Sequence, residues 1–458
     1  MKTFVKNLIL LAALTFTTHA TAYDFMVDGL CYNINSDSTT VTVTHENNST
    51  PYYSSLSGDI VIPEEVSFDN VTYSVIAIGN DSFRYCYDLT SVSIPNSVKS
   101  IGNYSFFNCF RIPNIAISNS VSSIGSYAFS GCTGLTTVVI PESVIFMGAA
   151  VFSECMGLTS VDINNSVISP YQFSNCTGLT SFKIPNSVTS IGDGAFEGCT
   201  GLTDINIPTS VTSIGNQAFK YCNSLKSIDL PSSIKEIGSS AFYDCSSLIK
   251  IVIPNSITTI ADQTFGGCAA LKEVDIPNTV TSIGLGAFGG CGQLASVNIP
   301  NSVTSIGELA FSLCSNIVHV SIPNSVNTIG HLAFALCKSL RSLYSFIQDP
   351  NLVSIGSDVF DDVPKEACEL HVPKGTRNLY VEADQWKDFK NIIDDLDGPV
   401  VPGDVDGNDT VNVSDVTTLV NMILGTVTKD PERADIDGNG NVNVSDVTAL
   451  VNIILGVE

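Results

Sequence analysis

Two duplicated segments near the end of the chain carry oxygen-bearing side chains at the spacing of a calcium-binding loop. The first, DVDGNDTVNVSD, begins at Asp404, and the second, DIDGNGNVNVSD, begins 31 residues later at Asp435. In both segments positions 1, 3, 5, 9 and 12 are Asp or Asn, and position 7 offers its backbone carbonyl. A hard cation such as Ca²⁺ takes about six to eight oxygen ligands. The pattern predicts two calcium sites, with the ligands Asp404, Asp406, Asn408, the Thr410 carbonyl, Asn412 and Asp415 in one and Asp435, Asp437, Asn439, the Asn441 carbonyl, Asn443 and Asp446 in the other.

A helix is predicted after each loop, where it would hold the last ligand in place. Apolar residues recur there at the i, i+3, i+4, i+7, i+8 spacing of one helix face. They are Val416, Leu419, Val420, Ile423 and Leu424 in the first copy and Val447, Leu450, Val451, Ile454 and Leu455 in the second. Gly425 and Gly456 stand where helix C-caps are expected. We expect the two helices to pack face to face. The alternative, an acidic turn before a surface helix, does not explain why both copies agree at nearly every ligand position.

The duplicated segment, 403–458, resembles a type I dockerin, the calcium-binding module that docks into a cohesin. One departure is Asp409, which stands where the loop normally has Gly for its sharp turn, so the first site is expected to be the weaker one. A second departure concerns the partner. Well-known dockerins carry a Ser-Thr pair at loop positions 10 and 11 and Lys-Arg on the helix. Here these positions read Val413-Ser414 with Val420-Asn421, and Val444-Ser445 with Val451-Asn452. The resemblance therefore implies a cohesin partner whose docking surface is less acidic and more apolar.

Most of the chain before this module is one short repeat, seen in CTGLTSFKIPNSVTSIGDGAFEG (residues 176–198). Its phenylalanine recurs every 23 residues, with one step of 21, at Phe83, Phe106, Phe129, Phe152, Phe173, Phe196, Phe219, Phe242, Phe265, Phe288, Phe311 and Phe334, and a thirteenth copy ends on Phe360. A unit this short cannot bury an apolar face alone, so the repeats are expected to stack as successive coils with a continuous core. The shortened copy around residues 164–171 is expected to kink the stack or to lose a turn.

Each part of the repeat has an expected role. Leu-x-x-Val-x-Ile-Pro predicts a short strand that the proline ends. In Ser-Val-x-x-Ile-Gly the chain turns back, and we expect the glycine to supply a positive φ. Ala-Phe-x-x-Cys predicts one helical or 3₁₀ turn that directs Phe and Cys inward. The repeat resembles the BspA-like leucine-rich repeat family, with its Asn-Ser-Val-x-x-Ile-Gly-x-x-Ala-Phe signature. The resemblance implies a solenoid of short strands with helical or 3₁₀ turns, joined here to a small all-α module.

The predicted domain organisation follows from where the repeat starts and stops. An exposed solenoid end is an open sheet edge and needs a cover. The strand-like stretch before the repeats and the stretch with the chain's only tryptophan, Trp386, are therefore interpreted as caps. The predicted parts are a signal peptide at 1–22, an N-terminal β cap at 23–80, the repeats at 81–363, a C-terminal cap at 364–396, a linker at 397–402 and the dockerin-like module at 403–458.

Fourteen cysteines in an exported chain would ordinarily suggest a disulfide framework. Twelve of them, from Cys86 to Cys337, instead lie three residues after a repeat phenylalanine. This register predicts a ladder of buried thiols, because stacked rungs about 5 Å apart have parallel Cβ vectors that favour no bridge. Cys31 and Cys368 lie outside the register, and for these two cysteines both a free thiol and a disulfide stay open.

Composition and the N-terminus indicate an exported protein. Residues 1–22 combine Lys2 and Lys6 with the apolar run LILLAALTF and a small-residue end, as signal peptides do. No stretch reaches the roughly 20 apolar residues of a transmembrane helix. A formal net charge of −25 would repel nucleic acid. The expected location is therefore extracellular or at a bacterial cell surface.

No catalytic constellation is found in the sequence. The five histidines are scattered, and the GxGxxG at residues 284–289 belongs to the ordinary repeat, with no βαβ unit around it. A polar, variable strand face remains, made of Ser160/Asp162, Ser181/Lys183, Asp204/Asn206, Ser227/Asp229, Lys250/Val252, Glu273/Asp275, Ser296/Asn298 and His319/Ser321. Because this face is poor in aromatic rings, it favours a protein ligand over a glycan.

We therefore expect a non-catalytic adhesion or protein-recognition solenoid that a dockerin attaches to a cohesin-bearing surface or assembly. Three alternatives stay open: a glycan-binding protein, a pure spacer in a cellulosome-like complex, and a component of a polysaccharide-degrading enzyme. The glycan alternative rests on Tyr104, Tyr127 and Tyr171, each two residues before a repeat phenylalanine.

Overall fold

The computed structural model describes residues 23–46, 56–163, 168–396, 405–406, 411–427, 431–436 and 441–455. The predicted signal peptide and linker, and part of the shortened repeat, lie outside these residues. The chain divides into two compact units, residues 1–180 and 181–458, and each is described by itself.

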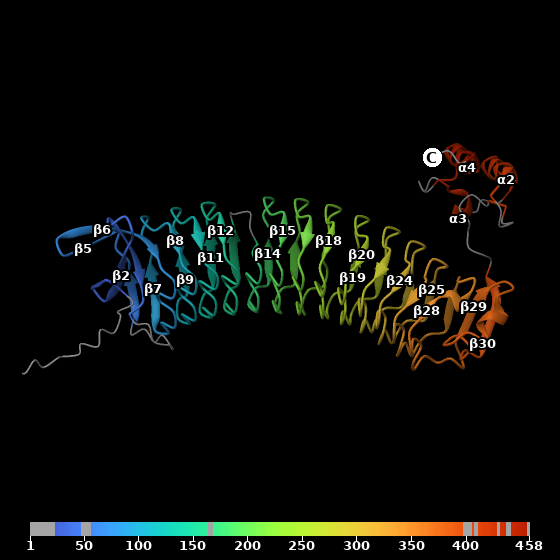
Figure 1. Cartoon of the computed structure of the whole chain (residues 1–458), viewed down its shortest axis with the longest axis horizontal. Coiled ribbons are helices and arrows are strands. Elements are labelled where there is room, and N and C mark those ends of the chain that lie inside the picture. Colours follow the sequence, from blue (N-terminus) through green and yellow to red (C-terminus); the bar gives the residue numbers. More distant parts are fainter. Residues whose placement is uncertain are drawn as a thin grey trace, which may run out of the picture. The chain divides into compact units, whose positions relative to one another are not determined.

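The first unit begins with a strand-rich segment that passes into stacked coils (Figure 1). Strands β1 to β3 are antiparallel neighbours, and the β5–β6 hairpin joins them because β6 pairs in parallel with β3. On its other edge β6 pairs in parallel with β8, the first short strand of the coils. One sheet therefore runs from the segment before the repeats into the repeats. Its strands are β1 (Phe25–Val27), β2 (Leu30–Ile34), β3 (Thr40–Thr44), β5 (Glu65–Phe68), β6 (Val71–Ile78), β8 (Ser100–Ile101), β10 (Ser123–Ile124) and β12 (Phe146–Met147).

A second set of parallel strands in this unit comes from the Leu-x-x-Val-x-Ile segments. They are β7 (Leu89–Ser93), which pairs with β4 (Gly58–Val61) from the segment before the repeats, and the ladder of β9 (Asn114–Ala116), β11 (Thr137–Ile140) and β13 (Ser160–Ile163). In β9 and β11 exposed and buried residues alternate, as the period-two pattern predicts.

The second unit repeats the same coil. The longer strands are β14 (Ser181–Lys183), β16 (Asp204–Asn206), β19 (Lys250–Val252), β21 (Glu273–Asp275), β23 (Ser296–Asn298), β25 (His319–Ile322), β27 (Ser342–Ser345), β29 (Glu369–Pro373) and β30 (Asn391–Leu396). The two-residue strands are β15 (Ser190–Ile191), β17 (Ser213–Ile214), β18 (Glu236–Ile237), β20 (Thr259–Ile260), β22 (Ser282–Ile283), β24 (Ser305–Ile306), β26 (Thr328–Ile329) and β28 (Ser354–Ile355). The Val-x-x-Ile-Gly segment therefore does more than turn the chain, since its Ser-Ile pair forms a parallel sheet of its own.

The core of the coils is a column of stacked phenylalanine rings. In the first unit neighbouring rings from Phe83 to Phe152 lie 5.0 to 5.4 Å apart and within 7° of parallel. In the second unit the column runs from Phe196 to Phe360. Its last ring meets Trp386 at 5.2 Å and Phe389 at 5.2 Å, both at steep angles. Trp386 is fully buried, so it covers the end of the column.

The predicted buried thiol ladder is confirmed, and the thiols also donate hydrogen bonds. All fourteen cysteines are unbridged and buried. Most repeat thiols donate to the carbonyl of the phenylalanine in the preceding coil, as Cys109 does to Phe83 at 3.1 Å and Cys245 to Phe219 at 3.2 Å. Burial raises the pKa of the Cys268 thiol to about 12, so the thiol stays protonated and remains a donor. A cysteine with this bond ties two coils together as well as filling the core.

The Ala-Phe-x-x-Cys segment is a tight turn rather than a regular helix. Cys86 N–H donates to the Phe83 carbonyl at 3.1 Å, the i→i−3 bond of a 3₁₀ turn. Residues two before and two after each phenylalanine have positive φ, for example Tyr104 at 52° and Asn108 at 61°. Left-handed residues at these two positions stop the turn from continuing as a helix.

The expected positive φ at the Ile-Gly glycine is wrong. Gly125 has no positive φ, and a Cβ at this position would lie 2.4 Å from the backbone nitrogen of Asn103 in the preceding coil. The same close approach recurs at Gly215 and Gly330. Glycine is needed here because the backbones of successive coils nearly touch. The residues with positive φ are instead those two positions before and two positions after each repeat phenylalanine.

The shortened coil keeps its phenylalanine in the column by means of a buried glutamine. Phe173 is fully buried, but its ring lies 6.0 Å from that of Phe152, the widest spacing in the first unit. Gln172, also fully buried, accepts a hydrogen bond from Ser169 N–H at 2.7 Å and places its amide nitrogen 3.0 Å from the Met147 sulfur. Most other copies have the smaller Ala or Ser at this position. Whether the stack kinks here stays a prediction.

The remaining elements belong to the second unit. They are η1 (Pro350–Leu352) and α1 (Arg377–Tyr380) near the end of the coils, and α2 (Val413–Ile423), α3 (Pro431–Ala434) and α4 (Val444–Leu455) in the duplicated segment. Within that segment α2, α3 and α4 share a small core made of Val405, Leu419, Met422, Ala434 and Leu450. None of the described helices is long and apolar enough to cross a membrane.

Candidate calcium loops and exposed repeat surfaces

The last carboxylate of the first loop joins the loop to its helix. Asp415 lies in the first turn of α2 and is fully buried. Its Oδ1 accepts a hydrogen bond from Asp406 N–H at 3.0 Å, and its Oδ2 accepts one from Asn412 N–H at 2.8 Å. Asn412 caps the helix through its own side chain, which accepts from Ser414 N–H at 2.8 Å. Loop positions 3, 9 and 12 are therefore brought together.

The second loop has the same construction. Asp446 is fully buried in the first turn of α4, and it accepts hydrogen bonds from Ile436 N–H and Asn443 N–H, both at 2.8 Å. Asn443 accepts from Ser445 N–H at 2.9 Å and donates through its amide to the Asn441 carbonyl at 2.9 Å. The bonds at the helix start, from Asn412 and Asn443, are equivalent in the two copies. The bond to the start of the loop comes from position 3 in the first copy and from position 2 in the second.

The oxygen donors present suit a hard cation. Among the predicted ligands, those within the described residues are Asp406, Asn412, Asp415, Asp435, Asn441, Asn443 and Asp446. Those outside them are Asp404, Asn408, Thr410, Asp437 and Asn439. In the part of the chain that the structure describes, no three His, Cys, Asp or Glu side chains are grouped closely enough to hold a metal. The described donors are carboxylate and amide oxygens, the ligand types that Ca²⁺ prefers.

The predicted inner faces of the two helices are only partly correct. Leu419 and Leu450 are fully buried, as expected. Leu424 and Leu455, however, are 69% and 67% exposed, and Met422, which the pattern did not include, is buried. The inner face of α2 is rotated towards Met422, whereas Ile453, the equivalent residue of α4, is 47% exposed. Val405, from the loop, and Ala434, from α3, complete the core between the helices. Gly425 adopts the positive φ of 75° expected just after a helix end.

The positions expected to meet a partner lie on the surface. Val413 and Val444, at loop position 10, are 71% and 69% exposed, and Val420 on α2 is 37% exposed. Val413 and Val444 are exposed at equivalent places in the two copies, whereas Val451, the equivalent of Val420, is half-buried.

The strand face of the coils is exposed as the sequence predicts. Its predicted residues are exposed throughout, except that Ser321 is half-buried. One ion pair on this face joins Lys250 and Glu273 at 3.8 Å.

The same strand face continues towards the end of the coils onto residues that the sequence reasoning missed. Tyr344 stacks on the ring of His371 at 4.6 Å. His371 Nδ1 lies 3.0 Å from Asp395, and His371 Nε2 lies 3.6 Å from Glu369. Tyr344 follows Leu340 by four residues, so the spacing rule that defined the face could have found it.

Comparisons with known families match almost the whole repeat array and the duplicated segment. The family described as BspA type leucine-rich repeat region matches residues 64–177, 166–274 and 258–380. The dockerin type I domain matches residues 402–455. Both families are non-catalytic modules. No curated protein matches the chain.

Solved structures with the same fold include bacterial leucine-rich repeat proteins. A leucine-rich repeat protein from Bacteroides ovatus is 29% identical, with a TM-score of 0.51 over 70% of this chain and 94% of that chain. The pneumococcal vaccine antigen PcpA is 16% identical, with a TM-score of 0.55 over 82% of this chain and 99% of that chain, and this likeness concerns the fold alone.

Proposed function

The chain belongs to the BspA-type leucine-rich repeat family and ends in a type I dockerin domain, and on that basis we propose that it is an exported, non-catalytic recognition protein. Its coils present a strand face to a protein ligand. Its dockerin attaches the coils, in a calcium-dependent way, to a cohesin on a cell surface or in a multiprotein assembly.

The duplicated, buried aspartates are the observation that carries the attachment half of the proposal. Asp415 and Asp446 each hold the first turn of a helix and the start of their own loop with two hydrogen bonds. A calcium ion bound by Asp404, Asp406, Asn408, the Thr410 carbonyl, Asn412 and Asp415, and a second bound by the equivalent residues of the other loop, would neutralise carboxylates that otherwise repel one another. Metal binding would thereby stabilise the two helices that carry the docking surface.

The exposed valines support an apolar cohesin partner. Val413 and Val444 lie in the first turns of α2 and α4, next to the buried ligands, so calcium binding and docking would be coupled through the same helix starts. Apolar side chains at the centre of an interface contribute most where they become fully desolvated. A cohesin with an acidic surface would gain little from these valines.

Binding of the full-length protein to a panel of immobilised cohesin modules tests this proposal. We expect at least one cohesin to retain the protein in calcium and to release it in EGTA. The double substitution Val413→Lys and Val444→Lys should abolish retention, because both copies lose their apolar contact. Val139→Lys, at a 55% exposed position on a coil, is the matched control and should bind normally. Retention that ignores EGTA, or that survives the double substitution, would contradict the proposal.

A further inference from the structure

Aromatic rings gather on the turns of the first three coils. We call this set the aromatic turn surface and define it as Tyr85, Tyr87, Tyr104, Phe107, Phe110 and Tyr127. The rings form one connected series. Tyr127 stacks on Tyr104 at 4.9 Å, Tyr104 meets Phe107 at 5.5 Å, and Phe107 meets Tyr85 at 5.6 Å. Tyr85 meets Tyr87 at 5.8 Å, and Tyr87 stacks on Phe110 at 5.0 Å.

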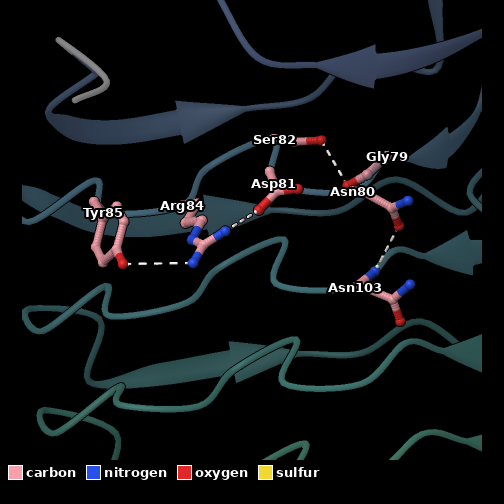
Figure 2. A network of polar contacts seen from close by, with 7 residues as sticks. All are labelled: Gly79, Asn80, Asp81, Ser82, Arg84, Tyr85 and Asn103. Carbon is pink, nitrogen blue, oxygen red and sulfur yellow. Dashed lines mark hydrogen bonds and ion pairs between the residues drawn. The ribbon is translucent and has the colours of Figure 1, made fainter. Parts of the chain in front are cut away.

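An arginine fixes the centre of this surface. The Arg84 guanidinium lies 5.0, 4.8 and 5.2 Å from the ring centres of Tyr85, Tyr104 and Phe107. It also pairs with Asp81 at 2.8 Å and donates to the Tyr85 hydroxyl at 3.5 Å, as Figure 2 shows. Only 24% of the Arg84 side chain is exposed. The surrounding rings are therefore held in place before any ligand arrives, which lowers the entropy cost of binding.

The neighbouring coils are also fixed relative to one another at this point. Asn80 Oδ1 accepts a hydrogen bond from Asn103 N–H at 2.8 Å, and Asn103 Oδ1 accepts one from Ser126 N–H at 2.7 Å. The first of these bonds links two successive coils beside the Arg84 cluster (Figure 2). The spacing of the rings is thus set by the coils themselves.

The outer rings of the series are available to a ligand. Phe110 is 42% exposed and Tyr127 is 36% exposed. Each stacks on one ring of the series, and no other ring of the described residues stacks on its opposite face. An aromatic face of this kind suits the C–H face of a sugar ring, which is apolar although its rim carries hydroxyls.

Polar side chains that suit hydroxyl groups flank the rings. Asp88 and Arg111 directly follow Tyr87 and Phe110 in the sequence and form an ion pair at 3.2 Å. Their side chains are 65% and 66% exposed, so both remain open to hydrogen bonds from a ligand. A carboxylate beside a guanidinium offers acceptors and donors to neighbouring sugar hydroxyls.

Charge and composition decide between ligand classes. The chain has a formal net charge of −25, which disfavours an acidic glycan or a nucleic acid. Cores of protein interfaces are depleted in charged residues. Here the rings are instead interspersed with Asp81, Asp88 and Arg111. This mixture favours a neutral sugar chain over a protein.

We propose that the aromatic turn surface binds a neutral polysaccharide. Sugar rings would stack on Phe110 and Tyr127, and Asp88 and Arg111 would hydrogen-bond to their hydroxyls. This site is distinct from the strand face and from the dockerin, so it adds a glycan-binding function that does not depend on either of them.

Native affinity electrophoresis of the full-length protein tests the proposal. The gels contain one of four neutral polysaccharides, namely mixed-linkage β-glucan, xyloglucan, arabinoxylan or galactomannan. We expect at least one of them to retard the protein. The double substitution Phe110→Ser and Tyr127→Ser should weaken binding about tenfold or more, because both rings that stack on the sugar are lost.

The matched control is Tyr221→Ser, which removes an equally exposed tyrosine (39%) from a turn of another coil and should leave retardation unchanged. Arg111→Ala keeps both rings and should also weaken binding, so it tests the site even if the double variant folds poorly. Retardation by none of the four polysaccharides would overturn the proposal and leave the surface to a protein ligand. Equal retardation of the wild type, the double variant and Arg111→Ala would overturn it as well.

Discussion

Replacing Phe219 with alanine should open a cavity that two neighbouring coils share. The Phe219 ring is fully buried, with the rings of Phe196 and Phe242 each 5.4 Å away and within 7° of parallel. Truncating a buried phenylalanine to alanine costs about 3 to 5 kcal/mol, from lost transfer free energy and the residual cavity. The upper part of this range applies here, because the coils cannot collapse into the gap without breaking their hydrogen bonds, and two ring contacts disappear at once.

Hydrogen exchange measured coil by coil shows this loss best. In a stacked array each coil contacts only its neighbours, so the opening free energy should fall by about 4 kcal/mol in the coils of Phe196, Phe219 and Phe242 and much less elsewhere. The matched comparison is Phe173→Ala in the shortened coil. Its ring lies 6.0 Å from that of Phe152, so it should cost less. Equal losses at both sites, or a loss below about 1 kcal/mol at Phe219, would refute the reasoning.

Three further predictions concern the thiols and the metal. Thiol titration of denatured, unreduced protein should find all fourteen cysteines free. The native protein should react slowly with the thiol reagent, because every cysteine is buried. If most cysteines were oxidised, neighbouring coils would be bridged and the prediction would be wrong. The Cys268 pKa rises to about 12 in the folded state from an ordinary value of 9.0, so its contribution to stability is complete below pH 9 and is lost as the pH rises towards 12. Urea unfolding between pH 8 and 11 should therefore show less alkaline destabilisation in Cys268→Ala than in the wild type, and equal pH slopes would contradict this. Chelation of calcium should melt α2 and α4, because their shared core is small. The circular dichroism of the coils should stay unchanged. Helices that persist in EDTA would show that the metal does not stabilise them.

The repeat pattern predicts the core well because a fixed period leaves little freedom. Once Phe and Cys recur three residues apart in every copy, stacking places each type in its own column. The left-handed position two residues after the phenylalanine also leaves a signal, since Asn108, Asn175 and Asp244 stand there, and Asn and Asp tolerate positive φ better than most residues do. The matching position two residues before the phenylalanine holds Tyr104 and Tyr127, for which no propensity rule predicts this backbone.

The sequence predictions fail where the structure depends on contacts between segments, because such contacts leave no periodic pattern in the sequence. The close approach at Gly125 depends on the backbone of the preceding coil. The core beside α2 includes Val405 and Ala434, which lie outside the helix pattern. Of the aromatic turn surface, the sequence analysis named only Tyr104 and Tyr127. Tyr87 and Phe110 lie at another position of the repeat and join the series only through contacts between rings.

Calcium titration of the full-length protein by calorimetry tests the central claim most directly. The account predicts two sites that bind at millimolar concentration or tighter. The substitution Asp446→Ala should cost more calcium affinity than Asp415→Ala, because Asp409 strains only the first loop and leaves that site weaker from the start. Absence of calcium binding, or two sites indifferent to both substitutions, would contradict the dockerin-based attachment on which the proposed function depends.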